Sequence, residues 1–195
     1  QANLLAGGPA YATEAARTTA IPSPFEGQRA YITGSTITTA TGTTSGTAGV
    51  PTGIQTIYNG SAWVTVSSVA AWSTTSGTSA TASYVTTLTS DGTAVSVTLQ
   101  TGTTALVTLS GMYSHSVAGG TNYTAFSVSG ATTLAAADNS SAFWNCPVIN
   151  YNTPFSWVAV VSGLTAGTNT FTMNYKTSGA TGQWTQRRLV VQGIA

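Results

Sequence analysis

Ionised side chains are scarce in this sequence. The chain has five Lys and Arg and four Asp and Glu, so charged residues make up 5% of its 195 residues, whereas an average soluble domain has about 25%. Nucleic-acid binding requires a basic patch that neutralises phosphates, and the only neighbouring basic residues here are Arg187 and Arg188. We therefore expect no nucleic-acid partner.

Cysteine and histidine each occur once, as Cys146 and His115. A single cysteine excludes an intramolecular disulfide and a cysteine-based zinc site, and the few acids form no sequence cluster that would bind calcium. We predict no metal and no other cofactor. Cys146 is expected to be a small buried residue beside Trp144 rather than a nucleophile.

The motifs of common hydrolases are also missing. The sequence contains no G-x-S-x-G elbow, and its four acids, Glu14, Glu26, Asp91 and Asp138, are spread along the chain. These positions disfavour a triad of a serine, His115 and Asp138. They also disfavour a glycosidase pair of Asp91 and Asp138. We predict that the protein is not an enzyme.

Long apolar runs are absent as well. The sequence has no run of about eighteen apolar residues and no signal peptide, so we expect no insertion into a membrane. It starts at Gln1 without a methionine, which leaves the native start of the chain open.

Serine and threonine are abundant, at roughly three residues in ten. Hydrophobic residues reach 42%, which is enough to fill a core, and β-branched threonine suits a strand with one exposed face. Free soluble proteins usually rely on interspersed charge for solubility. We therefore expect much of this neutral surface to be covered within an assembly or to function outside the cell.

The clearest strand pattern lies near the C-terminus. Polar and apolar residues alternate from Thr170 to Lys176, so that Phe171, Met173 and Tyr175 share one face, as in a strand with one buried side. Similar short runs recur at intervals typical of a sandwich or jelly roll. The predicted strands are 82–89, 94–100, 105–114, 123–129, 154–161, 170–176 and 187–193, with a long irregular connection between 130 and 153. We predict an all-β chain whose residues 71–195 form an antiparallel β-sandwich or jelly-roll head domain.

An N-terminal arm and a small β unit are expected before this domain. Residues 1–23 are interpreted as an arm with one short helix, which Pro9 opens and Ile21-Pro22 ends. Residues 24–70 are interpreted as a β-hairpin attachment unit, because Asn59-Gly60 joins two β-prone runs and is a strong hairpin signal. The two runs are 54–58 and 62–66, and a threonine- and glycine-rich loop over 34–52 precedes them.

Several of these segments resemble tail-fibre and minor-tail proteins of tailed bacteriophages. Those proteins pair a Pro-x-x-Gly-Gln-x-x-Tyr strand with a Tyr-Asn-Gly-Ser-x-Trp hairpin, which is similar to PSPFEGQRAYIT and YNGSAWVTV in this sequence. The lead-in QANLLAGGPAYATEAARTTAI looks like the linker that comes just before that strand. The ending, GLTAGTNTFTMNYKTSG and QRRLVVQGI, is similar to the last two strands of the β-sandwich head that closes many such proteins. Together these segments cover about half of the chain.

The resemblance implies a non-enzymatic structural protein exposed on the surface of a virion. It implies a homotrimer, in which threefold packing covers part of the neutral surface, and a tail-fibre or minor-tail role in which the head attaches to the host. The N-terminal region would then contact other virion proteins of the tail or capsid.

Two alternatives remain open. The sequence contains no long fibrous shaft, which leaves a capsid-decoration protein, either cement or head fibre, anchored to the shell by its N-terminal part, as a close competitor. A secreted carbohydrate-binding module or adhesin is the second alternative.

Aromatic residues are the remaining candidates for recognition, because sugar-binding sites stack rings on pyranose faces. Rings near predicted strand ends or loops are Tyr113, Tyr123, Trp144, Tyr151 and Trp184. As contacts with a host-surface glycan or a protein partner we single out Tyr113, His115, Tyr123 and Trp184. The competing interpretation makes most of these residues part of the core or of a trimer interface.

Overall fold

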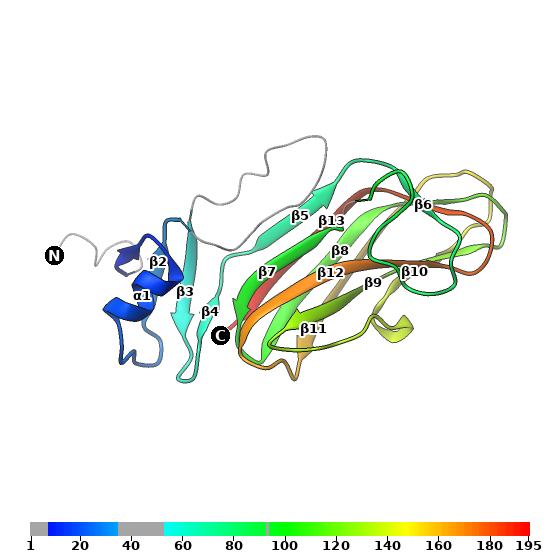
Figure 1. Cartoon of the computed structure of the whole chain (residues 1–195). Coiled ribbons are helices and arrows are strands. Elements are labelled where there is room, and N and C mark those ends of the chain that lie inside the picture. Colours follow the sequence, from blue (N-terminus) through cyan, green and yellow to red (C-terminus); the bar gives the residue numbers. More distant parts are fainter. Residues whose placement is uncertain (1–7, 35–52, 93) are drawn as a thin grey trace.

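Figure 1 shows the computed structural model, which describes residues 8–34, 53–92 and 94–195. A small sheet with one helix lies at one end, and a larger β-sandwich forms the rest of the molecule. The loop predicted over 34–52 lies outside the described residues, except for Gly34. No helix in the described part of the chain is long and apolar enough to cross a membrane.

The sandwich consists of two antiparallel sheets. Sheet 1 has the strand order β10-β9-β12-β7, and sheet 2 has the order β11-β8-β13-β5, with β6 also paired to β13. The strands of sheet 1 are β7 (Ser96–Thr101), β9 (Thr121–Gly130), β10 (Ala142–Asn145) and β12 (Gly167–Thr177). Those of sheet 2 are β5 (Val69–Ser73), β6 (Gly77–Ser79), β8 (Thr104–His115), β11 (Thr153–Ser162) and β13 (Gly182–Ile194).

The strand pairs are nested around one central hairpin. β9 pairs with β10, β8 with β11, β7 with β12, and β5 with β13, all antiparallel. Eight strands wound in this way across two sheets form a jelly roll. The predicted all-β sandwich or jelly-roll class is therefore confirmed.

Alternating side chains fill the space between the two sheets. In β12, Phe171, Met173 and Tyr175 are fully buried, as their spacing predicts. Val97 and Leu99 of β7 point into the same core. Full burial of such a side chain stabilises a fold by about 1.5–3 kcal/mol. β12 and β13, the two C-terminal strands, lie in different sheets and enclose the core from both sides.

The prediction was wrong for two segments of the sandwich. Residues 82–89 form only isolated bridges, which are Val85 with Tyr175, Leu88 with Asp91 and Thr89 with Thr78. Val85 and Leu88 are three positions apart and cannot share one face of a strand. The connection between 130 and 153 contains a short 3₁₀ helix, Asp138–Ser140, and strand β10. β10 has only four residues, too few for a clear period-two signal.

The N-terminal unit is a four-stranded sheet in the order β1-β2-β3-β4. Its elements are β1 (Ala10–Tyr11), α1 (Glu14–Ala20), β2 (Arg29–Ile32), β3 (Ile54–Tyr58) and β4 (Trp63–Thr65). The predicted hairpin is present as β3 and β4. Asn59 Oδ1 accepts backbone N–H groups of Ser61 and Ala62 at 3.1 and 2.9 Å, and Gly60 has a φ of 89° that favours glycine.

The described part of the predicted arm belongs to this sheet rather than standing apart from it. β1 pairs with β2, and α1 begins at the N-cap Thr13, whose side chain accepts the N–H of Ala16 at 3.1 Å. The helix ends at Ala20, just before the predicted stop at Ile21-Pro22. β5 starts the jelly roll at Val69, two residues before the expected domain boundary.

Arg17 joins the N-terminal unit to the jelly roll. This buried side chain of α1 donates from Nη1 to Thr56 Oγ1 at 3.3 Å and from Nη2 to Gln100 Oε1 of β7 at 3.2 Å. Its guanidinium lies 4.4 Å from the ring centroid of Trp63, and burial lowers the pKa of Arg17. One residue therefore links α1, β3, β4 and β7.

Candidate functional site

Two of the four predicted contact residues lie inside the jelly roll. Tyr113 and Trp184 have no exposed surface. The Tyr113 hydroxyl donates to the carbonyl of Ala142 at 3.1 Å, and Trp184 Nε1 donates to Thr124 Oγ1 at 3.0 Å. Burial raises the pKa of Tyr113 above its usual range. Both rings join strands of opposite sheets, so we no longer expect either to contact a glycan.

His115 is buried as well, at the end of β8. Its Nε2 lies 2.8 Å from Thr177 Oγ1, and its Nδ1 accepts the N–H of Val117 at 3.2 Å. Asp138, the acid considered for a triad, pairs with Lys176 on the outside of the molecule. His115 therefore fixes the turn after β8. It has almost no exposed surface with which to contact a glycan or another protein. Cys146 is buried, as predicted.

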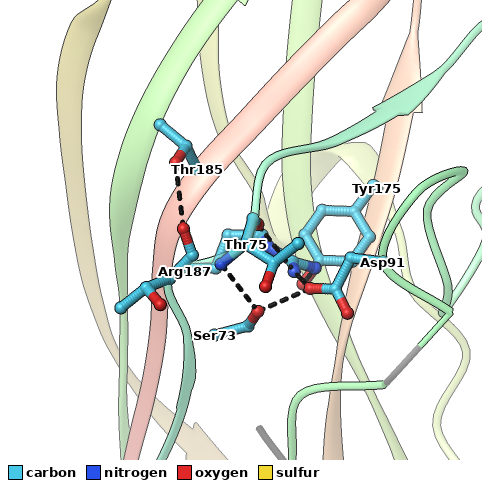
Figure 2. Close-up of polar contacts among 7 residues, drawn as sticks. Ser73, Thr75, Asp91, Tyr175, Thr185 and Arg187 are labelled. Carbon is cyan, nitrogen blue, oxygen red and sulfur yellow. Dashed lines mark hydrogen bonds and ion pairs between the residues drawn. The ribbon is translucent and has the colours of Figure 1, made fainter. Parts of the chain in front are cut away.

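A buried ion pair lies at the edge of sheet 2, where β5 meets β13 (Figure 2). Arg187 and Asp91 are both nearly inaccessible to solvent, and Nη2 of Arg187 donates to Oδ2 of Asp91. Nη1 of Arg187 donates to the Tyr175 hydroxyl at 3.0 Å, and the Ser73 hydroxyl donates to Asp91 Oδ2. Burial lowers the pKa of Arg187 to about 10, so the guanidinium remains charged at neutral pH.

This network connects strands rather than presenting reactive groups. Figure 2 shows Arg187 and Tyr175, which come from β13 and β12, converging with Ser73 and Asp91. The ladder between β13 and β8 shifts register between Thr185 and Arg188, and Gln186 in this bulge has a φ of 50°. Because a bulge re-aims side chains, Arg187 points inward, and we interpret the network as structural.

Tyr123 is the predicted contact that lies on the surface. It is half-buried on the outer face of sheet 1, where its ring stacks on Phe143 with centroids 6.0 Å apart. Lys176 Nζ lies 4.4 Å from the Tyr123 ring and 5.0 Å from the Tyr84 ring. Asp138 Oδ1 accepts from Lys176 and, at 3.0 Å, from the Tyr84 hydroxyl. We call Tyr84, Tyr123, Asp138, Phe143 and Lys176 the Tyr123 cluster.

The charges of the Tyr123 cluster are held in place by its rings. The hydrogen bond from Lys176 lowers the pKa of Asp138, and burial raises the pKa of Tyr84. Lys176 is 16% exposed between two tyrosines, whereas Asp138 is 60% exposed. The cluster thus presents a carboxylate beside an aromatic surface.

A groove with four aromatic residues adjoins this cluster. It has a volume of about 480 Å³ and lies where the edge strands β10 and β11 of the two sheets meet. Its lining consists of Ser141, Ala142, Phe143, Trp144, Pro154, Phe155, Ser156 and Trp157. Phe143 is 68% exposed and belongs to both sites. We call this feature the aromatic groove.

The aromatic groove combines ring faces with small polar groups and contains no ionised side chain. Trp157 packs on Phe126 of the core with centroids 6.0 Å apart, and Phe155 stacks on Tyr113 at 3.9 Å. Both rings are therefore rigidly supported from below. Such a surface suits a neutral ligand with apolar faces and hydroxyl groups, because rings pack on the faces and serine hydroxyls bind the edges.

Sequence reasoning found part of this site. It singled out Trp144 as an aromatic near a loop, but not Phe155 and Trp157, which lie in a strand with apolar residues at nearly every position. Phe155 and Trp157 reach the groove because β11 is an edge strand of sheet 2. That position is set by the pairing of β11 with β8, which no local signal in residues 153–162 reveals.

No protein-family model matches this chain, and no curated protein matches it. Among solved structures, the Eiger TNF of S. frugiperda is 13% identical over 52% of this chain and 65% of that chain, with a TM-score of 0.39. The VP2 subviral particle of infectious bursal disease virus is 10% identical over 72% of this chain and 42% of that chain, with a TM-score of 0.48. The CBM22-1 xylan-binding domain of Paenibacillus barcinonensis Xyn10C is 10% identical over 61% of this chain and 88% of that chain, with a TM-score of 0.25.

The chain therefore spans less than two thirds of the Eiger protein and less than half of VP2. None of the three likenesses assigns a function to this chain, because the identities are 13% or lower and the TM-scores are 0.48 or lower.

Proposed function

We propose that this chain is a non-enzymatic structural protein of a tailed-bacteriophage virion. In this proposal it is a homotrimeric tail-fibre or minor-tail protein that lies on the particle surface. Its N-terminal unit contacts other virion proteins, and its jelly-roll head attaches to the host surface.

The observation that carries this proposal is the pairing of the two segments that resemble phage tail proteins. The segment around Gly27-Gln28 lies directly beside the hairpin that begins at Tyr58. The N–H of Gly27 donates to the carbonyl of Tyr58 at 2.8 Å, and the N–H of Tyr58 donates to the carbonyl of Gln28 at 2.9 Å. β2 and β3 continue this antiparallel pairing, so the motif residues build one sheet, placed before the head as the resemblance implies.

The aromatic groove is the attachment site that we propose on the head. Its ligand is a neutral glycan of the host surface, because the groove lining carries rings and hydroxyl groups but no charge. Phe143 supplies an exposed ring at one side of the groove, and Asp138 of the adjoining Tyr123 cluster accepts hydrogen bonds from sugar hydroxyls.

Attachment is tested by binding of the purified full chain to host cells and to a panel of neutral glycans. Phe143→Ala should lower binding at least about tenfold, since stacked rings carry much of the energy of such sites. Phe25→Ala is the matched control, because Phe25 is a phenylalanine with the same exposure of 68%, located in the N-terminal unit. Equal binding by both variants and the original chain would exclude the groove as the attachment site.

A capsid-decoration role is the second candidate, and the exposed rings of the N-terminal unit favour it. Phe25 and Tyr31 are large and exposed, as expected of a surface that docks onto a shell. Copy number in purified particles separates the two roles. A few trimers per particle, labelled by antibody at the tail, support the tail role, whereas hundreds of copies over the shell support decoration. Absence from purified particles would contradict both roles.

A further inference from the structure

The outer face of sheet 2 exposes large aliphatic side chains among polar ones such as Thr108, Ser110 and Gln192. Val158 and Val160 of β11 are 58% and 62% exposed, and Ile194 of β13 is 41% exposed. In the strand register, Val158 of β11 and Val190 of β13 both pair with Thr108 of β8, which lies between them. Val160 pairs directly with Leu106 of β8. The apolar residues of this face, from β5 through β11, are Ala70, Trp72, Leu106, Val158, Val160, Val190 and Ile194. We call them the sheet 2 patch.

The only ionised side chain that the described residues place on this face is Arg188. Its guanidinium lies 5.6 Å from the ring centroid of Trp72, at the margin of the patch. A partner with charged groups would lose their hydration here without gaining an opposite charge. We therefore expect the partner surface to carry aliphatic side chains and few charges.

The edge next to this patch carries none of the usual protection against strand association. β11 has β8 as its neighbour in the described structure, and it borders the outside of the sandwich. Edge strands are commonly protected by charged side chains, especially lysine. Residues 139–175, which contain β11, include no Asp, Glu, Lys or Arg, and Pro154 interrupts only the start of the strand.

The size of the face is sufficient for a stable interface. The strands β8, β11 and β13 have ten or more residues and β5 has five, so at a spacing of about 4.8 Å they give a face of roughly 500 Å². With the edge of β11 added, this approaches the roughly 800 Å² per partner that standard interfaces bury. Exposed aliphatic side chains that cluster on such a face mark interaction sites.

We infer that the sheet 2 patch and the adjoining edge strand β11 form the interface between copies of this chain. The occupant is a second copy, since a copy offers aliphatic side chains that match the patch and an edge strand that carries no ionised side chain. The inference rests on the homotrimer in the proposed function, and it identifies the surface that holds the trimer together. In a closed threefold ring the contact joins two different surfaces, so the sheet 2 patch of one copy packs against the β11 edge of the next copy.

Sedimentation equilibrium of the full chain at micromolar concentration tests this interface. The original chain should sediment as a trimer, with three times the chain mass of 19.7 kDa. The Val160→Arg chain should sediment as a monomer. Ser129→Arg is the matched control, because Ser129 is exposed on a strand of the opposite face, in sheet 1. It should leave the trimer intact.

A milder variant guards against misfolding of Val160→Arg. Val160→Thr keeps the β-branched shape and replaces one methyl group with a hydroxyl, which the interface would bury away from water. It should weaken association about tenfold while the circular dichroism spectrum stays unchanged. Val160→Arg and Val160→Thr chains that remain trimeric at the original affinity would overturn this surface but not the trimer. A monomeric original chain would overturn the trimer and the interface together, and the glycan-binding test of the groove would stand separately.

Discussion

The two outer faces of the jelly roll have the same strand architecture but differ in the side chains that they expose. On sheet 1, most outward residues of β7, β9 and β12 are polar, and they include Ser96, Thr98, Ser127, Ser129, Thr168, Thr170 and Thr172. On sheet 2, serine and threonine alternate with the valine, leucine and isoleucine residues of the sheet 2 patch. Both faces therefore have side chains that favour strands, and sheet 2 exposes more large aliphatic residues to water.

Hydrogen bonds between hydroxyl side chains link neighbouring strands on the outer face of sheet 1. Thr98 Oγ1 lies 2.8 Å from Thr170 Oγ1, and Ser96 Oγ lies 2.9 Å from Thr172 Oγ1. Threonine is close to valine in shape, so it keeps the β-branched geometry of a strand while presenting a hydroxyl to solvent. The contrast indicates that the low charge of this protein has two different causes. Sheet 1 is polar mainly through hydroxyl groups, whereas sheet 2 exposes aliphatic side chains, as expected if copies of the chain cover it.

The same contrast separates the two ion pairs of the sandwich, and it gives the largest expected effect. Arg187 with Asp91 is buried at sheet 2, and Lys176 with Asp138 is exposed at sheet 1. Asp91→Ala should destabilise the chain by about 3–5 kcal/mol, because it leaves the Arg187 guanidinium buried without its counter-charge. Asp138→Ala should cost less than about 1 kcal/mol. Urea denaturation of both variants measures the difference, and similar losses would show that the two pairs are equally solvated.

A smaller effect is expected where α1 covers one end of sheet 1. Arg17 reaches from α1 to Gln100, which faces outward on β7. Arg17→Met keeps the apolar stem but removes the hydrogen bonds to Thr56 and Gln100, and it should cost about 1–2 kcal/mol. Hydrogen exchange should quicken in β1 to β4 while the jelly-roll strands keep their protection. Thr19→Val, at an exposed position of the same helix, is the control. Uniform acceleration across the whole chain would show that Arg17 is not a local link.

The sequence predicted the parts of the fold in which one face of a strand is clearly polar. β12 is such a strand, with Phe171, Met173 and Tyr175 opposite threonine, asparagine and lysine. β11 is different, because Phe155 and Trp157 face inward while Val158 and Val160 face outward. Its two faces are almost equally apolar, so alternation identifies a strand but not its exposed side. Only the position of β11 at the edge of sheet 2 makes that distinction.

The prediction of contact residues failed for a related reason. Tyr113 and Trp184 have polar atoms and lie near strand ends, which resembles the position of surface aromatics. Their partners, Ala142 and Thr124, come from distant strands of the opposite sheet. Burial of these rings thus depends on tertiary pairing, whereas Tyr123, on the outward face of β9, is partly exposed and stays a predicted contact.

Making sheet 1 resemble sheet 2 should produce association with little change in stability. The double variant Thr98→Val and Thr170→Val removes one hydroxyl pair, and such cross-strand pairs contribute only about 0.2–1 kcal/mol. The gain in exposed apolar area should nevertheless create assemblies larger than the original species, which light scattering detects. The reverse pair of changes, Thr98→Ser and Thr170→Ser, keeps the hydroxyls and is the control. An unchanged mass for the valine variant would mean that the hydroxyl groups are not what prevents association through sheet 1.

The smallest effect concerns the pH dependence of the exposed ion pair on sheet 1. The hydrogen bond from Lys176 holds the pKa of Asp138 below its ordinary value of 3.8. A carboxylate with a lowered pKa in the folded state stabilises that state above its unfolded pKa, and this contribution is lost as the pH falls through the folded value. The difference in Tm between the original chain and Asp138→Asn should therefore be present at pH 7 and should decline as the pH falls below 3.8 towards the lowered pKa of Asp138. Because Asp138 is 60% exposed, 0.5 M salt at pH 7 should also reduce the difference. A Tm difference that is independent of both pH and salt would show that Asp138 acts through packing, and the polar face of sheet 1 would then be less open to solvent than its chemistry indicates.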